Sequence, residues 1–234
     1  MKSGRILFIL AILAIVACLA QPVLAETDNA TQFYNRGSQT ASAGDYAGAI
    51  ALFDQALASN TTQISKSDTL MYVYNDKAAA LTDLGKYDEA VKTAEQGLAL
   101  YKNSPGLWNN KGYALYKQGK FNDAITAYDT AISAAAAQND TYLKGYINKG
   151  IALNKAGRSY EAVGTFTKAL ELDPGNTDAT AGLAEAQKAT MTTNIVLAAI
   201  VIVALGIVIW YVKFRKPADG KDASAKKNTK SKKE

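Results

Sequence analysis

Residues 107–131 read LWNNKGYALYKQGKFNDAITAYDTA, and this stretch decides the fold of the 234-residue chain. A bulky residue, Trp108, stands four places before the small Gly112. After Gly119, a second bulky residue, Tyr128, stands three places before an alanine. Residues three or four apart lie on one face of a helix, and glycine readily ends a helix in the left-handed conformation. The stretch therefore predicts two short helices that turn back at Gly119 and pack large side chains against small ones.

The same pattern occurs four times between residues 30 and 174. The turn glycines are 41, 34 and 38 residues apart, and they are Gly44, Gly85, Gly119 and Gly157. The bulky residues of the first helices are Phe33, Tyr74, Trp108 and Tyr146, and the small residues four places later are Gly37, Ala78, Gly112 and Gly150. Ser159 occupies a place in the fourth copy that is aromatic in the other three, so we expect that turn to be shifted by one residue.

The spacing and the alternation of large and small residues resemble the tetratricopeptide repeat family. Leu172-Asp173-Pro174 closes the fourth copy with the terminal proline of that family. The resemblance implies an all-α fold, a right-handed solenoid of four helical hairpins plus a capping helix. The solenoid would occupy residues 26–190. Its repeats would span about 30–63, 71–104, 105–138 and 143–176, and its cap 177–190.

In such a solenoid the first helices line a concave groove that suits a peptide or a partner's helix. Two places before the small residue of each first helix stand Asn35, Asp76, Asn110 and Asn148. We expect these side chains to form a ladder that bonds the backbone of a peptide, because a carboxamide offers both a donor and an acceptor. The alternative is that they only meet water.

Aromatic anchors are the second expected feature of the groove. Tyr113 and Tyr116 are the best candidates, and Tyr34 and Tyr72 lie on or near the same face. Packing in the core is the alternative for each tyrosine. The paired cations of the family's carboxylate clamp are absent, so the carboxyl-terminal tails of chaperones are not the expected ligand.

The composition excludes several kinds of catalytic site. The chain has no histidine, and its single cysteine is Cys18. Histidine-dependent triads, cysteine nucleophiles and His/Cys zinc sites are therefore excluded from the middle of the chain. We expect no enzyme activity, no cofactor and no metal. A carboxylate-based hydrolase stays formally open because it needs only Asp and Glu.

The amino-terminal end is typical of a secretory signal. Lys2 and Arg5 precede an unbroken apolar run, and cleavage is expected after residue 25. Two alternatives to the signal peptide of residues 1–25 are an uncleaved anchor and lipid modification at Cys18. Candidate glycosylation acceptors in the portion that would lie outside the cytoplasm are Asn29, Asn60 and Asn139.

Near the other end, residues 194–212 are predicted to form a transmembrane helix. Ile195 to Val212 carries no charge, and Trp210 and Tyr211 stand where an interfacial aromatic belt belongs. Residues 213–234 form a basic tail of net charge +6, expected to be disordered, cytoplasmic and in contact with anionic lipid. The expected location is thus the cell membrane, with a single pass and the repeats outside the cytoplasm.

These features predict a membrane-anchored scaffold that binds a partner protein in the concave groove. The alternative is an assembly factor for envelope complexes that acts through the convex face and the transmembrane helix. With its tyrosine-rich repeats, sequons and single carboxyl-terminal anchor, the chain also resembles cell-surface proteins of methanogenic archaea, and a bacterial origin is the alternative. Nucleic acid is not an expected partner, because the basic residues flank the membrane segments and the middle of the chain is acidic.

Overall fold

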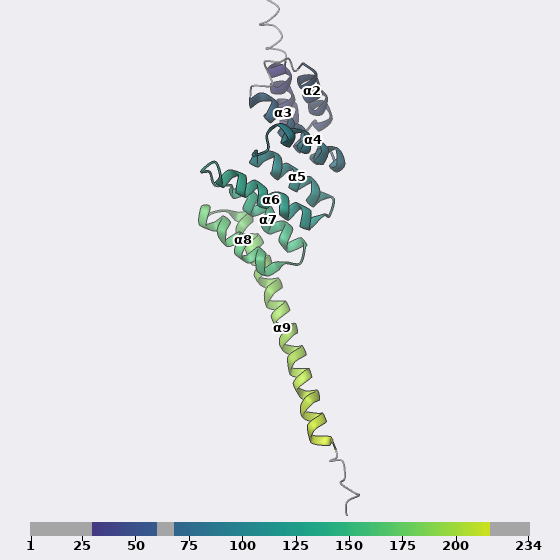
Figure 1. Cartoon of the computed structure of the whole chain (residues 1–234), viewed down its shortest axis with the longest axis vertical. Coiled ribbons are helices and arrows are strands. Elements are labelled where there is room, and N and C mark those ends of the chain that lie inside the picture. The colour runs from purple at the N-terminus through teal and green to yellow at the C-terminus, as the bar shows by residue number, and fades with distance from the viewer. Residues whose placement is uncertain (1–29, 60–67, 216–234) are drawn as a thin grey trace, which may run out of the picture. The chain divides into compact units, whose positions relative to one another are not determined.

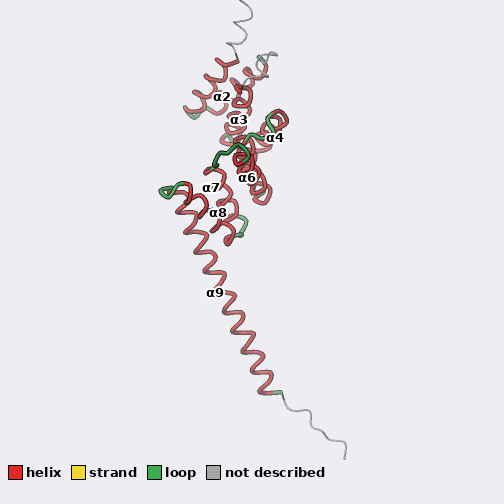
Figure 2. Tube along the Cα trace, turned by 60° about the vertical axis from the view of Figure 1, so that its left-hand side comes forward, coloured by secondary structure: helices red, strands yellow, loops and turns green. Residues whose placement is uncertain are grey.

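The computed structural model describes residues 30–59 and 68–215. These residues form helices joined by short turns and contain no strand (Figure 2). The all-α class and the arrangement in stacked hairpins are therefore confirmed. The expected signal peptide with Cys18, the sequons at Asn29 and Asn60, and nearly all of the basic tail lie outside the described residues.

Four helical hairpins follow one another along the chain (Figure 1). Hairpin 1 is the helix over residues 30–42 with α2 (Tyr46–Ala58), and hairpin 2 is α3 (Asp68–Asp83) with α4 (Tyr87–Leu100). Hairpin 3 is α5 (Pro105–Lys117) with α6 (Phe121–Ala136), and hairpin 4 is α7 (Leu143–Lys155) with α8 (Ser159–Leu172). The last helix is α9 (Thr177–Phe214). The chain divides into two compact units, the first up to Gln187 and the second from Lys188, and each is described by itself.

A glycine makes the turn inside each hairpin. In hairpin 3, Gly119 has a φ of 77°, and the backbone N–H of Lys120 donates to the carbonyl of Leu115 at 3.0 Å. The equivalent bond closes the other three turns, and the φ of their glycines lies between 74° and 85°. Residues with a Cβ rarely adopt this conformation, so the glycine and its hydrogen bonds fix the turn.

The expected shift of the fourth turn was wrong. α8 begins at Ser159, two residues after Gly157, just as α6 begins at Phe121, two residues after Gly119. The turn keeps its register because backbone hydrogen bonds define it, and the aromatic side chain takes no part in them. Tyr160, which the shift would have moved into that place, is 59% exposed.

Large side chains pack directly on small ones between the two helices of a hairpin. A Cβ added to Gly112 would lie 2.7 Å from the ring of Tyr128, which is 1% exposed. The same close approach joins Gly37 to Phe53 and Gly150 to Phe166. Hairpin 2 reaches the same result with two alanines, Ala78 and Ala94, both fully buried. This fit fixes how the two helices of each hairpin face each other.

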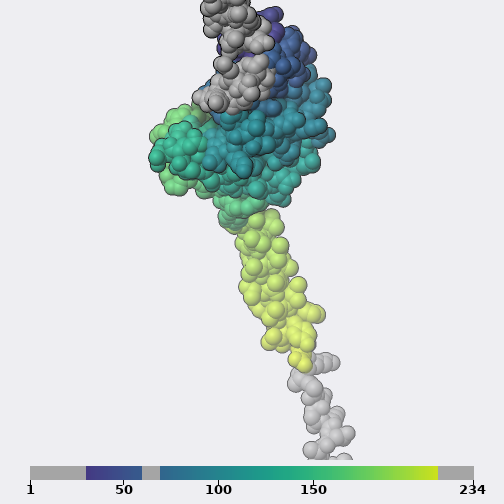
Figure 3. Space-filling model, turned by 45° about the horizontal axis from the view of Figure 1, so that its top comes forward, coloured from purple at the N-terminus to yellow at the C-terminus, as the bar shows by residue number. Residues whose placement is uncertain are grey.

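Ion pairs join each hairpin to the next through the second helix of the earlier one. The cation stands immediately before the small residue of a first helix, and the acid stands on the preceding hairpin's second helix. The pairs are Lys77–Asp54, Lys111–Glu95 and Lys149–Asp129, with N–O distances of 2.5, 2.8 and 2.5 Å. We call this set the lysine ladder. In unit 1, successive hairpins form one packed body (Figure 3).

The first turns of α9 cover the open side of hairpin 4. Ala179 and Ala186 are fully buried in the same core cluster as Phe166. The side-chain amide of Asn154 donates to the carbonyl of Gly182 at 3.1 Å. This part of α9 therefore acts as a cap, because it hides an apolar surface that a further hairpin would otherwise cover.

In the second unit, α9 is exposed from Met191 onward, and its stretch from Ile195 to Val212 carries no charge. By length and composition it could cross a membrane. The helix continues through Asn194 without a break.

Candidate functional site

Two members of the predicted ladder bond the neighbouring hairpin. Asn110 is 8% exposed, and its Nδ2 donates to the backbone oxygen of Asn75 at 2.8 Å and to the side-chain oxygen of the same residue at 3.0 Å. Asn148 Nδ2 donates to Asn109 Oδ1 at 2.8 Å. Each carboxamide thus links its own first helix to the first helix of the preceding hairpin.

Asp76 follows the same rule with the roles of donor and acceptor reversed. The hydroxyl of Tyr34, on the preceding first helix, donates to Asp76 Oδ2 at 3.0 Å, and Asn75 Nδ2 donates to Oδ1 at 3.1 Å. Burial of the phenol, together with the negative charge and hydrogen bond of Asp76, raises the pKa of Tyr34 to about 12. Tyr34 is therefore neutral at physiological pH and remains a donor.

Asn35 belongs to hairpin 1, and the described residues contain no earlier hairpin for it to bond. Its side chain is exposed. The four predicted residues are therefore one structural row, of which three point to the preceding first helix and the first points to solvent. Peptide binding by this row stays a prediction, and Asn35 is its most accessible member.

A polar furrow lies between the helix over residues 30–42 and α3. It has a volume of about 310 Å³, and its walls include Ser38, Ser42, Tyr46, Asp76 and Asp83. These residues come from the carboxyl-terminal halves of two neighbouring first helices and from the start of α2. A furrow of this kind can receive one or two side chains of a bound segment. We call it the acidic furrow, because two aspartates and no cation line it.

The two predicted tyrosine anchors have different surroundings. Tyr113 is half-buried, and the ammonium of Lys117 lies over its ring, 5.2 Å from the ring centre. Tyr116 packs on the core cluster, with its ring centre 5.6 Å from that of Phe121. Tyr113 with Lys117 therefore presents an aromatic and cationic surface, whereas Tyr116 mainly supports the fold.

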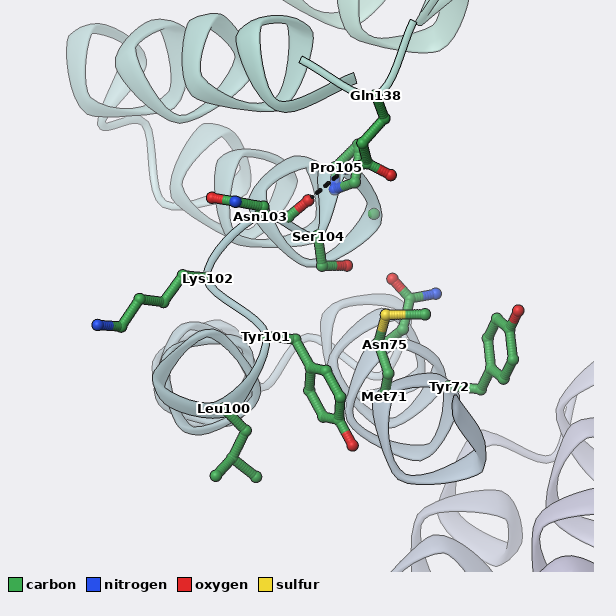
Figure 4. Close-up of a pocket in the computed structure, with 11 residues that line it drawn as sticks. Met71, Tyr72, Asn75, Leu100, Tyr101, Lys102, Asn103, Ser104, Pro105 and Gln138 are labelled. Atoms are coloured by element: carbon green, nitrogen blue, oxygen red, sulfur yellow. Dashed lines mark hydrogen bonds between the residues drawn. The ribbon is translucent and has the colours of Figure 1, made fainter. Parts of the chain in front are cut away.

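A larger cavity, which sequence reasoning missed, opens where hairpins 2 and 3 meet (Figure 4). Its volume is about 590 Å³, and residues from the start of α3, the end of α4, the loop to α5 and Gln138 line it. Gln138 Nε2 donates to the carbonyl of Asn103 at 2.7 Å and so holds the loop in place. Figure 4 shows Tyr72, Tyr101 and Met71 at one side of the cavity and Asn103 and Ser104 at the other.

One sequence signal of this cavity was available. Gly106 stands in the first turn of α5, and a Cβ there would lie 2.7 Å from Asn75 Oδ1. A glycine inside a helix usually marks a close approach of another group. Within the ranges 30–59 and 68–215, no group of three or more His, Cys, Asp or Glu residues could hold a metal ion.

Three family models described as tetratricopeptide repeat match this chain, over residues 28–103, 75–140 and 143–176. The chain is 29% identical over 123 residues to the TPR repeat-containing protein MJ1428 of Methanocaldococcus jannaschii, which covers 51% of this chain and 21% of that protein. It is also 29% identical over 113 residues to the Hsp70-Hsp90 organizing protein of Triticum aestivum, covering 48% and 19%. The chain spans a third or less of the length of the curated relatives that it matches first.

Solved structures have the same fold. The crystal structure of the MamA protein superposes with a TM-score of 0.57 at 17% identity, over 82% of this chain and 98% of that one. The NMR structure of the first TPR domain of human RPAP3 superposes with a TM-score of 0.51 at 26% identity, over 55% of this chain and 98% of that domain.

Proposed function

Because the chain belongs to the tetratricopeptide repeat family, we propose that unit 1 is a non-enzymatic scaffold that binds a segment of a partner protein along its first helices. The proposal rests on the acidic furrow between hairpins 1 and 2, together with the half-buried Tyr113 and the exposed Lys117 on the first helix of hairpin 3. The segment is an extended peptide or a helix. Both can lay side chains into furrows between parallel ridges.

A relative supports this class of function. The wheat relative is by name an Hsp70-Hsp90 organizing protein. A chaperone tail is not the proposed ligand, because the paired cations of the family's carboxylate clamp are absent. The corresponding places on the first helices of hairpins 1, 2 and 3 hold Tyr34 and Ser38, then Asp76, then Gly106 and Asn110.

The inward row of carboxamides changes which residues contact the partner. Asn110 and Asn148 already bond the preceding hairpin, so they set the spacing of the first helices. Contacts to a bound segment then fall on Asn35, Tyr113 and the walls of the acidic furrow. Substituting Asn110 would disturb the solenoid and the ligand together, so it is a poor test of binding.

The scaffold is proposed to act at the cell membrane, with the repeats outside the cytoplasm and α9 crossing the bilayer once. The exposed apolar stretch of α9 supports this arrangement. Lys213 and Arg215, at its end, are the charges expected on the cytoplasmic side. Protease added to intact cells should then digest the repeats and spare an epitope fused to the carboxyl terminus.

Site-specific photocross-linking in the native membrane tests the binding face. A photoreactive phenylalanine analogue replaces Tyr113 in the full chain, and the matched control carries it at Thr126, an exposed residue of the second helix α6. We expect a discrete adduct with a partner only from position 113. Adducts from position 126 alone would refute groove binding and favour an assembly factor that acts through its outer face.

A further inference from the structure

The first helices carry a row of side chains whose charge changes sign along the array. Five places after the small residue of each first helix stand Ser42, Asp83, Lys117 and Lys155. The row is therefore neutral, negative, positive and positive from hairpin 1 to hairpin 4. We call these four residues the charge row.

The charges of this row are not neutralised by ion pairs within the described part of the chain. Asp83, Lys117 and Lys155 are all exposed and take part in none of the ion pairs found there. The ammonium of Lys117 lies over the ring of Tyr113 and forms none of these ion pairs. The cations of the lysine ladder, in contrast, each have an acid within 2.8 Å. The charge row is thus available to a partner.

Two furrows at different places in the array carry opposite charge. The acidic furrow, between hairpins 1 and 2, has Asp76 and Asp83 in its wall. A second furrow of about 460 Å³, between the turn of hairpin 3 and the end of α7, has Lys120 and Lys155 in its wall together with one acid, Asp123. The second is net positive.

We propose that the partner segment is bipolar, with basic residues that lie in the acidic furrow and acidic residues that lie against Lys117 and Lys155. This inference rests on the proposed function and names the chemistry of its ligand. A uniformly acidic segment would meet like charge at Asp83, and a uniformly basic one would meet it at Lys155. Charges placed along a binding face fix the direction of the bound segment and speed its encounter more than they tighten the complex.

Peptides of one composition and different charge order test the proposal. The probes are three fluorescein-labelled peptides with a neutral Tyr- and Leu-containing centre. One has three lysines at its amino end and three glutamates at its carboxyl end, the second has the reverse order, and the third alternates the charges. Binding to the full chain in nanodiscs is measured by fluorescence anisotropy. We expect one block order to bind about tenfold more tightly than the alternating peptide at low salt, and the advantage to shrink at high salt.

A charge-reversed chain provides the decisive comparison. The triple variant Asp83→Lys, Lys117→Asp, Lys155→Asp should prefer the opposite block order. The control variant exchanges the charges of an ion pair away from the row, Lys111→Glu with Glu95→Lys, and should keep the original order. Thermal melting followed by circular dichroism checks that each variant is folded.

The outcomes separate this inference from the proposed function. Equal binding of all three peptides, no binding of any, or an unchanged preference in the triple variant overturns the bipolar ligand. If the photoreactive residue at position 113 still cross-links a partner, the partner binds in the groove but its charge order is not recognised. If no cross-link forms at position 113, the proposed function itself is refuted.

Discussion

Replacing Gly112 with alanine should destabilise hairpin 3, although alanine is the better helix former. The added Cβ would lie 2.7 Å from Tyr128 Cε1 and 2.9 Å from Cδ1. Tyr128 is 1% exposed and has no room to move away from the new methyl group. Overpacking of this kind costs about 1–3 kcal/mol, whereas glycine to alanine in a helix gains at most about 1 kcal/mol. We expect a net loss of about 1–2 kcal/mol.

Gly164 is the matched control for this change. It lies inside α8, and a Cβ there would meet nothing within 4 Å. Gly164→Ala should therefore stabilise the chain by about 0.5–1 kcal/mol. The two variants make the same chemical change, so the difference between their effects on stability, about 1.5–3 kcal/mol, isolates the contact with Tyr128.

The fluorescence of Trp108 reports the unfolding of hairpin 3. Trp108 lies on α5, and its indole N–H donates to the carbonyl of Lys102 at 2.8 Å. The measurement is a urea titration of the full chain in detergent, in a Trp210→Phe background that removes the other tryptophan. A second background, Tyr128→Ala, deletes the ring, and there Gly112→Ala should cost nothing. Equal gains from Gly112→Ala and Gly164→Ala in the parent chain would refute the packing argument.

Two further predictions concern the row of carboxamides and its acidic member. Asn110→Ala should lower the free energy of unfolding by about 1–2 kcal/mol, because two acceptors on Asn75 lose their donor. Asn35→Ala should change it by less than about 0.5 kcal/mol. Similar effects of the two in urea titrations would contradict the inward orientation. Tyr34 should titrate near pH 12 by ultraviolet absorbance, measured as the difference from Tyr34→Phe, and Asp76→Asn should bring its pKa back toward 10.0. Since folding raises this pKa, its contribution to stability is complete below pH 10 and is lost as the pH rises to 12. A Tyr34 pKa that is unchanged by Asp76→Asn would exclude the carboxylate as a cause.

The hairpins could be predicted from the sequence because their signals are local. The glycine that ends a first helix, the aromatic residue and the small residue that it packs against all lie within one hairpin of about thirty residues. Tyr128 illustrates this, since the sequence predicts that large side chains of a hairpin pack on small ones, and the structure shows the ring of Tyr128 packed on Gly112. The expectation of a shifted turn at Ser159 is wrong because the aromatic residue found after the other turn glycines accompanies the turn and does not cause it.

The binding face could not be predicted to the same depth. The orientation of Asn110 depends on the angle by which hairpin 3 is rotated against hairpin 2. The spacing of residues along one helix does not determine that angle. The cavity lined by Tyr72 and Gln138 needs four segments from two hairpins to come together. Features made by one hairpin follow from its own residues, whereas features made between hairpins need the packed array.

The lysine ladder limits how the array could grow during evolution or by design. Arg36 holds the lysine's place in hairpin 1, where no earlier hairpin is described, and Thr167 holds the acid's place in hairpin 4. If a copy of hairpin 3 were inserted after hairpin 2, the Lys111 of the copy would pair with Glu95. The Asp129 of the copy would pair with the Lys111 of the original hairpin 3, so every ion pair of the lysine ladder would be kept. The same module appended after hairpin 4 would meet a threonine hydroxyl instead of a carboxylate. Internal insertion is therefore the electrostatically favoured way to lengthen this protein.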